Sequence, residues 1–257
     1  KYRASGRSSY AKSRGVLNCV MMDEAEKSGV KIHFNHRCTG IDIENNISKF
    51  DYNGVEVEVK SRLIFSADGA FSAGRLQMQL STDRFEYSQN YLKHGYKELL
   101  IPAGDGEKFL MEKNALHIWP RGGYMLIALP NLDGSFTCTL FFPFEGTDSF
   151  ASIKSESDCE EFFNRVFPDA IKLMPDVAKQ FFHNPTGSLV TVKCFPWTVK
   201  DKLCLIGDAA HAIVPFYGQG MNCGFEDCTV LDQLMEKHGD NWEKILNEFQ
   251  ESRKPNS

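Results

Sequence analysis

Apolar positions at the beginning of the chain recur with the spacing of a helix. Ser13 is a suitable N-cap and Gly29 a suitable stop, so the pattern predicts a helix over residues 13–28. A short strand over residues 30–34 should follow. The predicted helix carries one apolar stripe, formed by Val16, Leu17, Val20, Met21 and Ala25.

Alternation of apolar and polar residues then predicts strands. Asn53-Gly54 between two alternating segments is the strongest short signal for a β-hairpin. The apolar segment 63–67 should be a buried strand, and it ends at Asp68-Gly69. These residues predict a hairpin followed by a buried strand that ends in a turn at Asp68-Gly69.

Longer alternating segments between residues 85 and 144 predict an antiparallel sheet. The last of these segments is apolar on both of its faces, so something should cover each face of the sheet. We expect a helix on one face and a ligand cavity on the other. The predicted strands are residues 91–101, 116–119, 124–129 and 135–142, the last two joined by a turn at residues 131–134.

The remainder of the chain mixes helices with short strands. Together with the sheet, this order predicts a mixed α/β (α+β) fold. The predicted helices cover residues 156–166, 175–182, 220–237 and 242–253, and the predicted strands cover residues 189–194 and 202–207.

Composition excludes several classes of protein. With 257 residues, 42% of them hydrophobic, the chain can bury a sizeable core. The net charge of -5, without a basic cluster, gives no field that attracts nucleic acid. No apolar run approaches the roughly 18 residues of a membrane span. Eight cysteines without a C-x-x-C pair indicate reduced thiols and an intracellular protein.

Gly207-Asp208, at the end of an apolar strand, is the most informative motif. A carboxylate there can accept hydrogen bonds from sugar-like hydroxyls, and the unpaired N–H groups of a following helix suit an electron-rich ring edge or an anion. An isolated Gly-Asp would more simply be an N-cap. The following Pro215 and the glycines Gly218 and Gly220 let the backbone approach a flat ligand, which favours a cofactor site.

The segment from Asp68-Gly69 to Arg75 is the second motif. Ser72 and Arg75 are three residues apart, so a carboxylate, a hydroxyl and a guanidinium should lie close together at the start of a helix. Such a cluster can hold a pyrophosphate. Alone, Asp-Gly is usually a turn, and its value here is that it accompanies the first motif.

The two motifs together resemble the D-G-x-x-S-x-x-R and G-D signatures of the flavin-dependent aromatic hydroxylases, in the same order. The resemblance covers nearly the whole chain and is closest to the members that hydroxylate L-kynurenine. The segments that carry it are residues 94–99, 116–121, 135–141 and 207–228.

That resemblance implies an incomplete Rossmann-like FAD-binding domain in two parts, residues 1–85 and 187–257, the second including the start of C-terminal helices. An antiparallel-sheet substrate domain, residues 86–186, would be inserted between them and form a roof over the flavin. The implied FAD-binding residues are Arg14, Asp68, Gly69, Arg75, Gly207, Asp208, Pro215, Gly218, Gly220, Met221 and Asn222. The implied substrate-binding residues are Tyr2, Leu116, Met125, Ile127, Leu129, Phe141, Phe216 and Gln219.

The implied reaction is hydroxylation of L-kynurenine at carbon 3, with NADPH as electron donor and O2 as oxidant through a flavin C4a-hydroperoxide. FAD then carries the chemistry and no protein residue is catalytic. Ordinary core packing is the simpler interpretation of each apolar residue in the set. Two alternatives stay open: a related hydroxylase with another aromatic substrate, and a catalytically silent segment that only binds ligand.

Other features favour ordinary roles. His33 and His36 lack further ligands at metal spacing, so they predict no metal site. There is no G-x-G-x-x-G at a first strand, and we therefore expect the segment alone to fold poorly, hold FAD weakly and be inactive. The resemblance places the protein in the cytoplasm, or on the mitochondrial outer membrane if a C-terminal anchor follows.

Overall fold

The computed structural model describes residues 14–256 of the chain. Two compact units share these residues. The first consists of Leu92–Ser188 and the described part of Lys1–Ile32, and the second of His33–Tyr91 and Leu189–Ser257. Strands β5 (Glu86–Ile101) and β9 (Thr186–Phe195) each contribute residues to both units.

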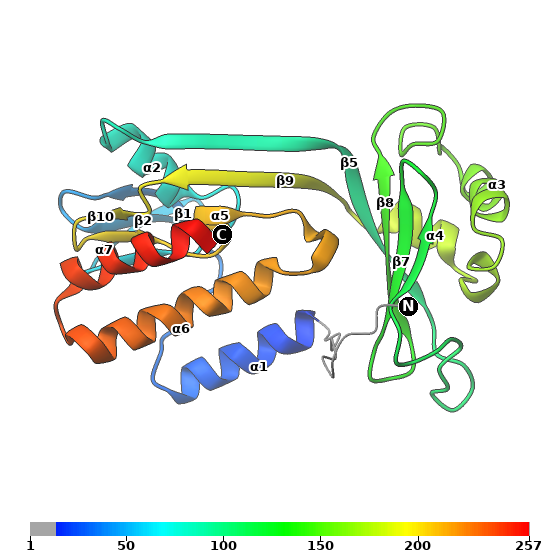
Figure 1. Cartoon of the computed structure of the whole chain (residues 1–257), viewed down its shortest axis with the longest axis horizontal. Coiled ribbons are helices and arrows are strands. Elements are labelled where there is room, and N and C mark those ends of the chain that lie inside the picture. Colours follow the sequence, from blue (N-terminus) through cyan, green and yellow to red (C-terminus); the bar gives the residue numbers. More distant parts are fainter. Residues whose placement is uncertain (1–13, 257) are drawn as a thin grey trace. The chain divides into compact units, whose positions relative to one another are not determined.

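A five-stranded sheet with the order β6-β7-β8-β5-β9 forms the centre of the first unit (Figure 1). Its antiparallel pairs join β5 with β8, β8 with β7, and β7 with β6. The predicted antiparallel sheet is therefore confirmed. The three strands not yet defined are β6 (His117–Pro120), β7 (Met125–Pro130) and β8 (Phe136–Pro143).

One face of this sheet packs on a helical layer. The layer consists of α3 (Glu156–Val166), η1 (Ile171–Leu173) and α4 (Val177–His183). Helix α3 begins at a capping box in which the Ser155 hydroxyl accepts the Asp158 N–H and the Asp158 carboxylate accepts the Ser155 N–H. Phe136, Cys138, Leu140 and Phe142 of β8, all 0% exposed, join the helices in one apolar core, so the prediction of a helix on one face is confirmed.

Tyr124 lies at the edge of this core and donates its hydroxyl to Asp148 at 2.8 Å. Burial, the hydrogen bond and the charge of Asp148 raise the pKa of Tyr124 to about 12. Between the ordinary tyrosine pKa and this value, the folded chain keeps a proton that the unfolded chain releases. The free energy of unfolding should therefore fall as pH rises from about 10 to about 12.

Tyr124→Phe should remove this contribution, so the variant should lose less stability over that window. Denaturant unfolding at about pH 9 and about pH 11.5 measures the difference. Burial also raises the pKa of the Cys138 thiol, to about 12, which adds a loss of the same sign in both chains. The comparison between the two chains isolates the tyrosine, and equal losses would contradict this prediction.

The second unit contains a three-stranded antiparallel sheet in the order β1-β2-β3. The predicted hairpin is confirmed, because Asn53 and Gly54 join β2 to β3 with φ of 54° and 84°. Both residues thus have the positive φ that a tight hairpin turn requires. The strands are β1 (His36–Asp42), β2 (Ile47–Tyr52) and β3 (Val55–Lys60).

A smaller sheet of the second unit has the order β10-β11-β4, with β11 (Leu203–Leu205) parallel to β4 (Ile64–Ser66) and antiparallel to β10 (Thr198–Val199). Parallel neighbours end at the same edge. The turns that follow β4 and β11, which carry the two predicted motifs, therefore leave this sheet on the same side.

Helices surround the smaller sheet. Leu203 and Leu205 of β11 join one apolar core with Leu234 of α6 and Phe249 of α7, and α6 and α7 lie side by side (Figure 1). The helices of this unit are α2 (Ala73–Ser81), α5 (Asp208–His211), η2 (Pro215–Tyr217), α6 (Gly220–His238), α7 (Trp242–Arg253) and η3 (Lys254–Asn256).

The beginning of the described chain differs partly from prediction. Helix α1 (Arg14–Lys27) forms and is followed by Gly29 at φ 89°. Of its predicted apolar stripe, Val20 and Met21 are each 49% exposed, whereas Leu17 and Ala25 are half-buried. The strand predicted over residues 30–34 is wrong: β1 begins only at His36, and an extended segment without a paired neighbour forms no ladder.

All eight cysteines carry free thiols. Within the described residues, no helix combines the length and the apolar character needed to span a membrane. The same residues include no group of three or more histidine, cysteine, aspartate or glutamate side chains arranged to hold a metal ion.

Candidate functional site

The carboxyl end of β11 leads into a turn that only glycine adopts readily. Gly207 has φ 58° and ψ -141°, a region that strains residues with a Cβ. Its carbonyl accepts hydrogen bonds from Ala210 and His211, which closes the one-turn helix α5. Asp208 is the first residue of this helix, and its side chain is exposed. The strand thus presents a carboxylate at the position predicted for a cofactor ligand.

The segment after α5 folds back toward the Asp208 side chain. A Cβ built on Gly220, at the start of α6, would lie 3.8 Å from Oδ1 of Asp208. Gly218 has φ 63°, and a Cβ built on it would meet no atom within 4 Å. The predicted cofactor residues Pro215, Gly218, Met221 and Asn222 are exposed in this segment, as are the predicted substrate residues Phe216 and Gln219. The structure therefore brings Asp208 and the glycine-containing segment together on one open surface.

The second motif forms the start of α2. Asp68 accepts hydrogen bonds from the Ser66 hydroxyl at 2.7 Å and from the N–H groups of Ala73 at 2.7 Å and Gly74 at 3.3 Å. Burial raises the pKa of Asp68, but these hydrogen bonds and that of Ser72 outweigh burial and hold the pKa below its usual range. Gly69, at φ 81°, makes the turn between β4 and this helix. Asp68 is thereby an ionised residue that orders the N-terminus of α2.

Arg75 connects the two motifs. Its side chain is buried, and its guanidinium donates to the carbonyl of Ala209 at 2.8 Å and of Ala70 at 2.5 Å. The guanidinium carbon lies 5.0 Å from the ring centre of Tyr87. Arg75 therefore holds the turn after β4 against α5, a contact that the local spacing of Ser72 and Arg75 could not reveal.

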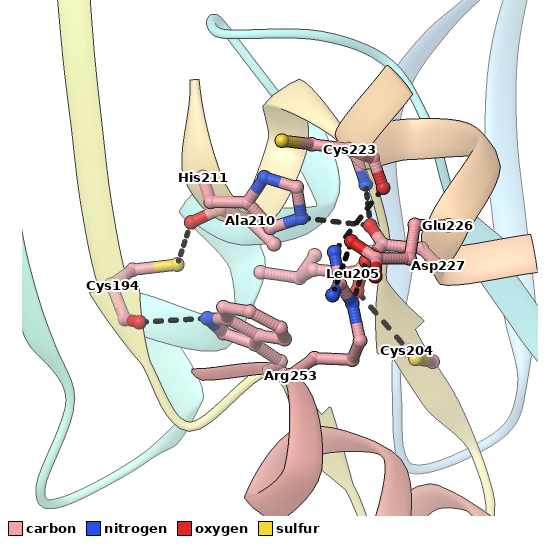
Figure 2. Close-up of polar contacts among 11 residues, drawn as sticks. Cys194, Cys204, Leu205, Ala210, His211, Cys223, Glu226, Asp227 and Arg253 are labelled. Atoms are coloured by element: carbon pink, nitrogen blue, oxygen red, sulfur yellow. Dashed lines mark hydrogen bonds and ion pairs between the residues drawn. The ribbon is translucent and has the colours of Figure 1, made fainter. Parts of the chain in front are cut away.

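A buried polar network lies under α5, as Figure 2 shows. Asp227 of α6 is 0% exposed and contacts His211 and Arg253, which are 5% and 2% exposed. Burial raises the pKa of Asp227, but hydrogen bonds from His211, Arg253 and Gly207 outweigh burial and lower it. Sequence reasoning did not find Asp227 or Arg253, since each is an ordinary charged residue of an amphipathic helix until the fold buries it.

The predicted substrate residues of the first unit share one face of its sheet. Met125 pairs with Phe141, Ile127 with Thr139 and Leu129 with Thr137. Because side chains alternate along a strand, these residues point away from the helical layer, on which Leu126 and Ala128 pack. Extending the β6–β7 register by one residue places Leu116 opposite Leu129 on the same face.

Two of the predicted site residues cannot be placed. Tyr2 and the side chain of Arg14 lie outside the described part of the chain. Phe216 and Gln219 belong to the second unit, whereas Leu116, Met125, Ile127, Leu129 and Phe141 belong to the first.

Curated relatives match along the entire chain. A kynurenine 3-monooxygenase of Flavobacterium johnsoniae is 53% identical over an alignment of 259 positions, gaps included, that covers 100% of this chain and 58% of the relative. A kynurenine 3-monooxygenase of Dictyostelium discoideum is 48% identical over 96% of this chain and 56% of the relative. The chain thus spans less than two thirds of the length of these relatives.

Solved structures share the fold. A tetrameric 2-methyl-3-hydroxypyridine-5-carboxylic acid oxygenase superposes with a TM-score of 0.75 at 23% identity, covering 93% of this chain and 61% of that one. Klebsiella pneumoniae HpxO, solved with FAD and uric acid, gives a TM-score of 0.67 at 21% identity over 95% of this chain and 59% of that one. The family described as "FAD binding domain" matches residues 4–257. The chain therefore belongs to the FAD binding domain family.

Proposed function

We propose that this chain is part of an FAD-dependent monooxygenase that hydroxylates L-kynurenine at carbon 3, with NADPH and O2 as co-substrates. The observation that carries the proposal is the exposed carboxylate of Asp208 beside the glycine-containing start of α6, in a chain whose relatives named kynurenine 3-monooxygenase match it from end to end. Residues 1–85 and 187–257 would bind the cofactor, and residues 86–186 the substrate.

The residues present fit FAD. Asp208 can accept hydrogen bonds from the hydroxyls of a ribityl chain, and an ionised acceptor makes such bonds strong. Gly218 and Gly220 leave room for a flat ring beside the backbone of residues 215–222. When bound, FAD accepts reducing equivalents from NADPH and activates dioxygen. The chain's own residues would hold and orient the ring.

The apolar face of the sheet fits an aromatic substrate. Met125, Ile127 and Leu129 are half-buried and offer side chains that pack on a ring and exclude water from it, whereas Phe141, paired with Met125, is only 3% exposed. Exclusion of water matters because it protects a reactive oxygen species from side reactions. Positioning also matters, since a small displacement of the ring carbon from the reacting oxygen costs much of the rate.

Phe141→Ala tests the substrate assignment. The variant should reduce kynurenine-stimulated oxidation of NADPH by about tenfold or more, because it removes an aromatic packing partner from the proposed substrate face. The measurement uses a chimera in which this chain replaces the matching segment of the Flavobacterium johnsoniae relative, of which it covers 58%. Leu132→Ala, at an 85% exposed turn position of the same unit, should keep wild-type rates. Because Phe141 is only 3% exposed, thermal unfolding and KM are measured for both variants, so that a loss of folded protein is separated from a loss of substrate binding.

The same assay separates the alternatives. If Phe141→Ala leaves the response to kynurenine untouched, another aromatic substrate is favoured. If the wild-type chimera binds FAD and kynurenine in equilibrium titrations yet oxidises no NADPH, the chain acts by binding alone. Either result would contradict the proposed function.

A further inference from the structure

Asp227 holds the turn of Asp208 from both sides. One of its carboxylate oxygens, Oδ2, accepts the N–H of Gly207 at 2.8 Å and Nε2 of His211 at 2.7 Å (Figure 2). Gly207 directly precedes Asp208, and His211 is the last residue of α5. A single buried oxygen thus fixes the backbone before Asp208 and the far end of the helix that Asp208 begins.

The other oxygen of Asp227 anchors this arrangement to α7. Oδ1 accepts Nε of Arg253 at 2.7 Å, and the same guanidinium donates to the carbonyl of Cys223 at 3.3 Å. Arg253 also pairs at 2.7 Å with Glu226, whose side chain is 60% exposed. The carboxylate of Asp227, on α6, therefore accepts hydrogen bonds from the turn before α5, from the last residue of α5 and from α7.

The turn is also packed closely against α6. A Cβ on Gly224 would approach Cα of Gly207 to 3.9 Å, and the ring of His211 lies 5.1 Å from that of Trp197, whose indole N–H is bonded to the Cys194 carbonyl. A buried ion pair of this kind contributes little net stability compared with apolar residues of the same volume. We therefore look for the role of the Asp227 network in the backbone conformation of residues 207–211, which lets each of its donors make a hydrogen bond.

We propose that Asp227 is a positioning residue for the cofactor: together with His211 and Arg253 it sets the backbone of residues 207–211 so that Asp208 meets FAD. This inference rests on the proposed function. Asp227 itself is 0% exposed, so it cannot reach a ligand on the surface directly. It acts through the N–H of Gly207 and through the ring of His211.

Asp227→Asn should weaken FAD binding by the chimera about tenfold, because an amide cannot present an acceptor oxygen to Gly207 and His211 without turning its NH2 group toward Arg253. It should also shift the visible absorption and the reduction potential of the bound flavin. Loss of stability alone would lower the folded fraction while leaving the dissociation constant and the spectrum of the folded molecules unchanged. Glu226→Gln is the matched control, since it removes a carboxylate from the same arginine, and it should bind FAD within about twofold of wild type.

His211→Phe provides a second variant in case Asp227→Asn does not fold. It keeps an aromatic ring beside Trp197 and removes only the Nε2 donor, so FAD affinity should fall in the same direction. Hydrogen exchange of the Gly207 amide in the chimera, measured without cofactor, should be faster in either variant than in Glu226→Gln. Wild-type FAD affinity and spectrum in His211→Phe, together with unchanged protection of Gly207, would overturn the inference. A wild-type chimera that binds no FAD would overturn the proposed function instead, and Gly207 exchange would still test the role of Asp227.

Discussion

Replacement of Asp208 by alanine should lower the affinity for FAD by at least about a hundredfold, because the two ribityl hydrogen bonds proposed for this charged acceptor are each worth about 1.5–3 kcal/mol. The side chain is exposed at the start of α5, so its removal leaves no cavity in the core. The fold of the second unit should persist. The effect should therefore appear in binding and not in stability.

Titration of the chimera with FAD, followed by quenching of flavin fluorescence, measures this effect. Asp201→Ala is the matched control, since it removes an exposed aspartate from the turn just before β11 and should keep wild-type affinity. Asp208→Asn should lie between the two, as an amide oxygen accepts hydrogen bonds without the charge. Equal affinities of Asp208→Ala and wild type would contradict the assignment of this residue to the cofactor.

Gly74→Ala should destabilise the second unit by several kcal/mol, above the ~1–3 kcal/mol typical of an overpacked core site. Gly74 lies in the first turn of α2, and a Cβ there would come within 2.6 Å of the Cβ of Ser66 on β4. Real Cβ atoms do not approach so closely, so α2 must move away from the strand. The same displacement would break the hydrogen bond between the Ser66 hydroxyl and Asp68, and with it the order of the second motif.

Thermal and denaturant unfolding of the chimera measure the loss. Gly40→Ala is a matched control, because a Cβ at that position of β1 would meet no atom within 4 Å. The double variant Ser66→Gly with Gly74→Ala removes the atoms that clash and should recover much of the stability, giving a coupling energy of opposite sign to the single losses. If the two substitutions change the free energy of unfolding additively, the contact between Ser66 and residue 74 is not the cause of the destabilisation by Gly74→Ala.

The elements predicted well are those with strong local signals. The hairpin at Asn53-Gly54 follows from residues that tolerate positive φ, and α3 matches the helical pattern predicted over residues 156–166. The strands around β8 follow from alternation. Residues 30–34 failed because a strand exists only when a neighbour supplies its hydrogen bonds, which a local pattern cannot reveal.

The residues of the candidate site can likewise be divided into those predicted from local sequence and those whose contacts depend on the tertiary fold. Sequence alone placed Asp208 at the end of a strand, in front of a segment rich in glycine, because strand length, glycine and the following helix are all local signals. The apolar residues of the sheet face were predicted only from the resemblance; the strand register places them on one face, and their contact with substrate stays a prediction. For Arg75, the sequence suggested a pyrophosphate ligand, whereas the fold brings its guanidinium to the carbonyl of Ala209, 134 positions away.

The sequence by itself therefore determined the elements and the residues of the Gly207-Asp208 motif, since these depend on backbone preferences and on spacing within a few residues. Tertiary structure alone decided that Asp227, His211 and Arg253 form one buried network under that motif. The physical reason is that a charged residue becomes a positioning group only when packing removes water from it and leaves protein donors as its sole partners.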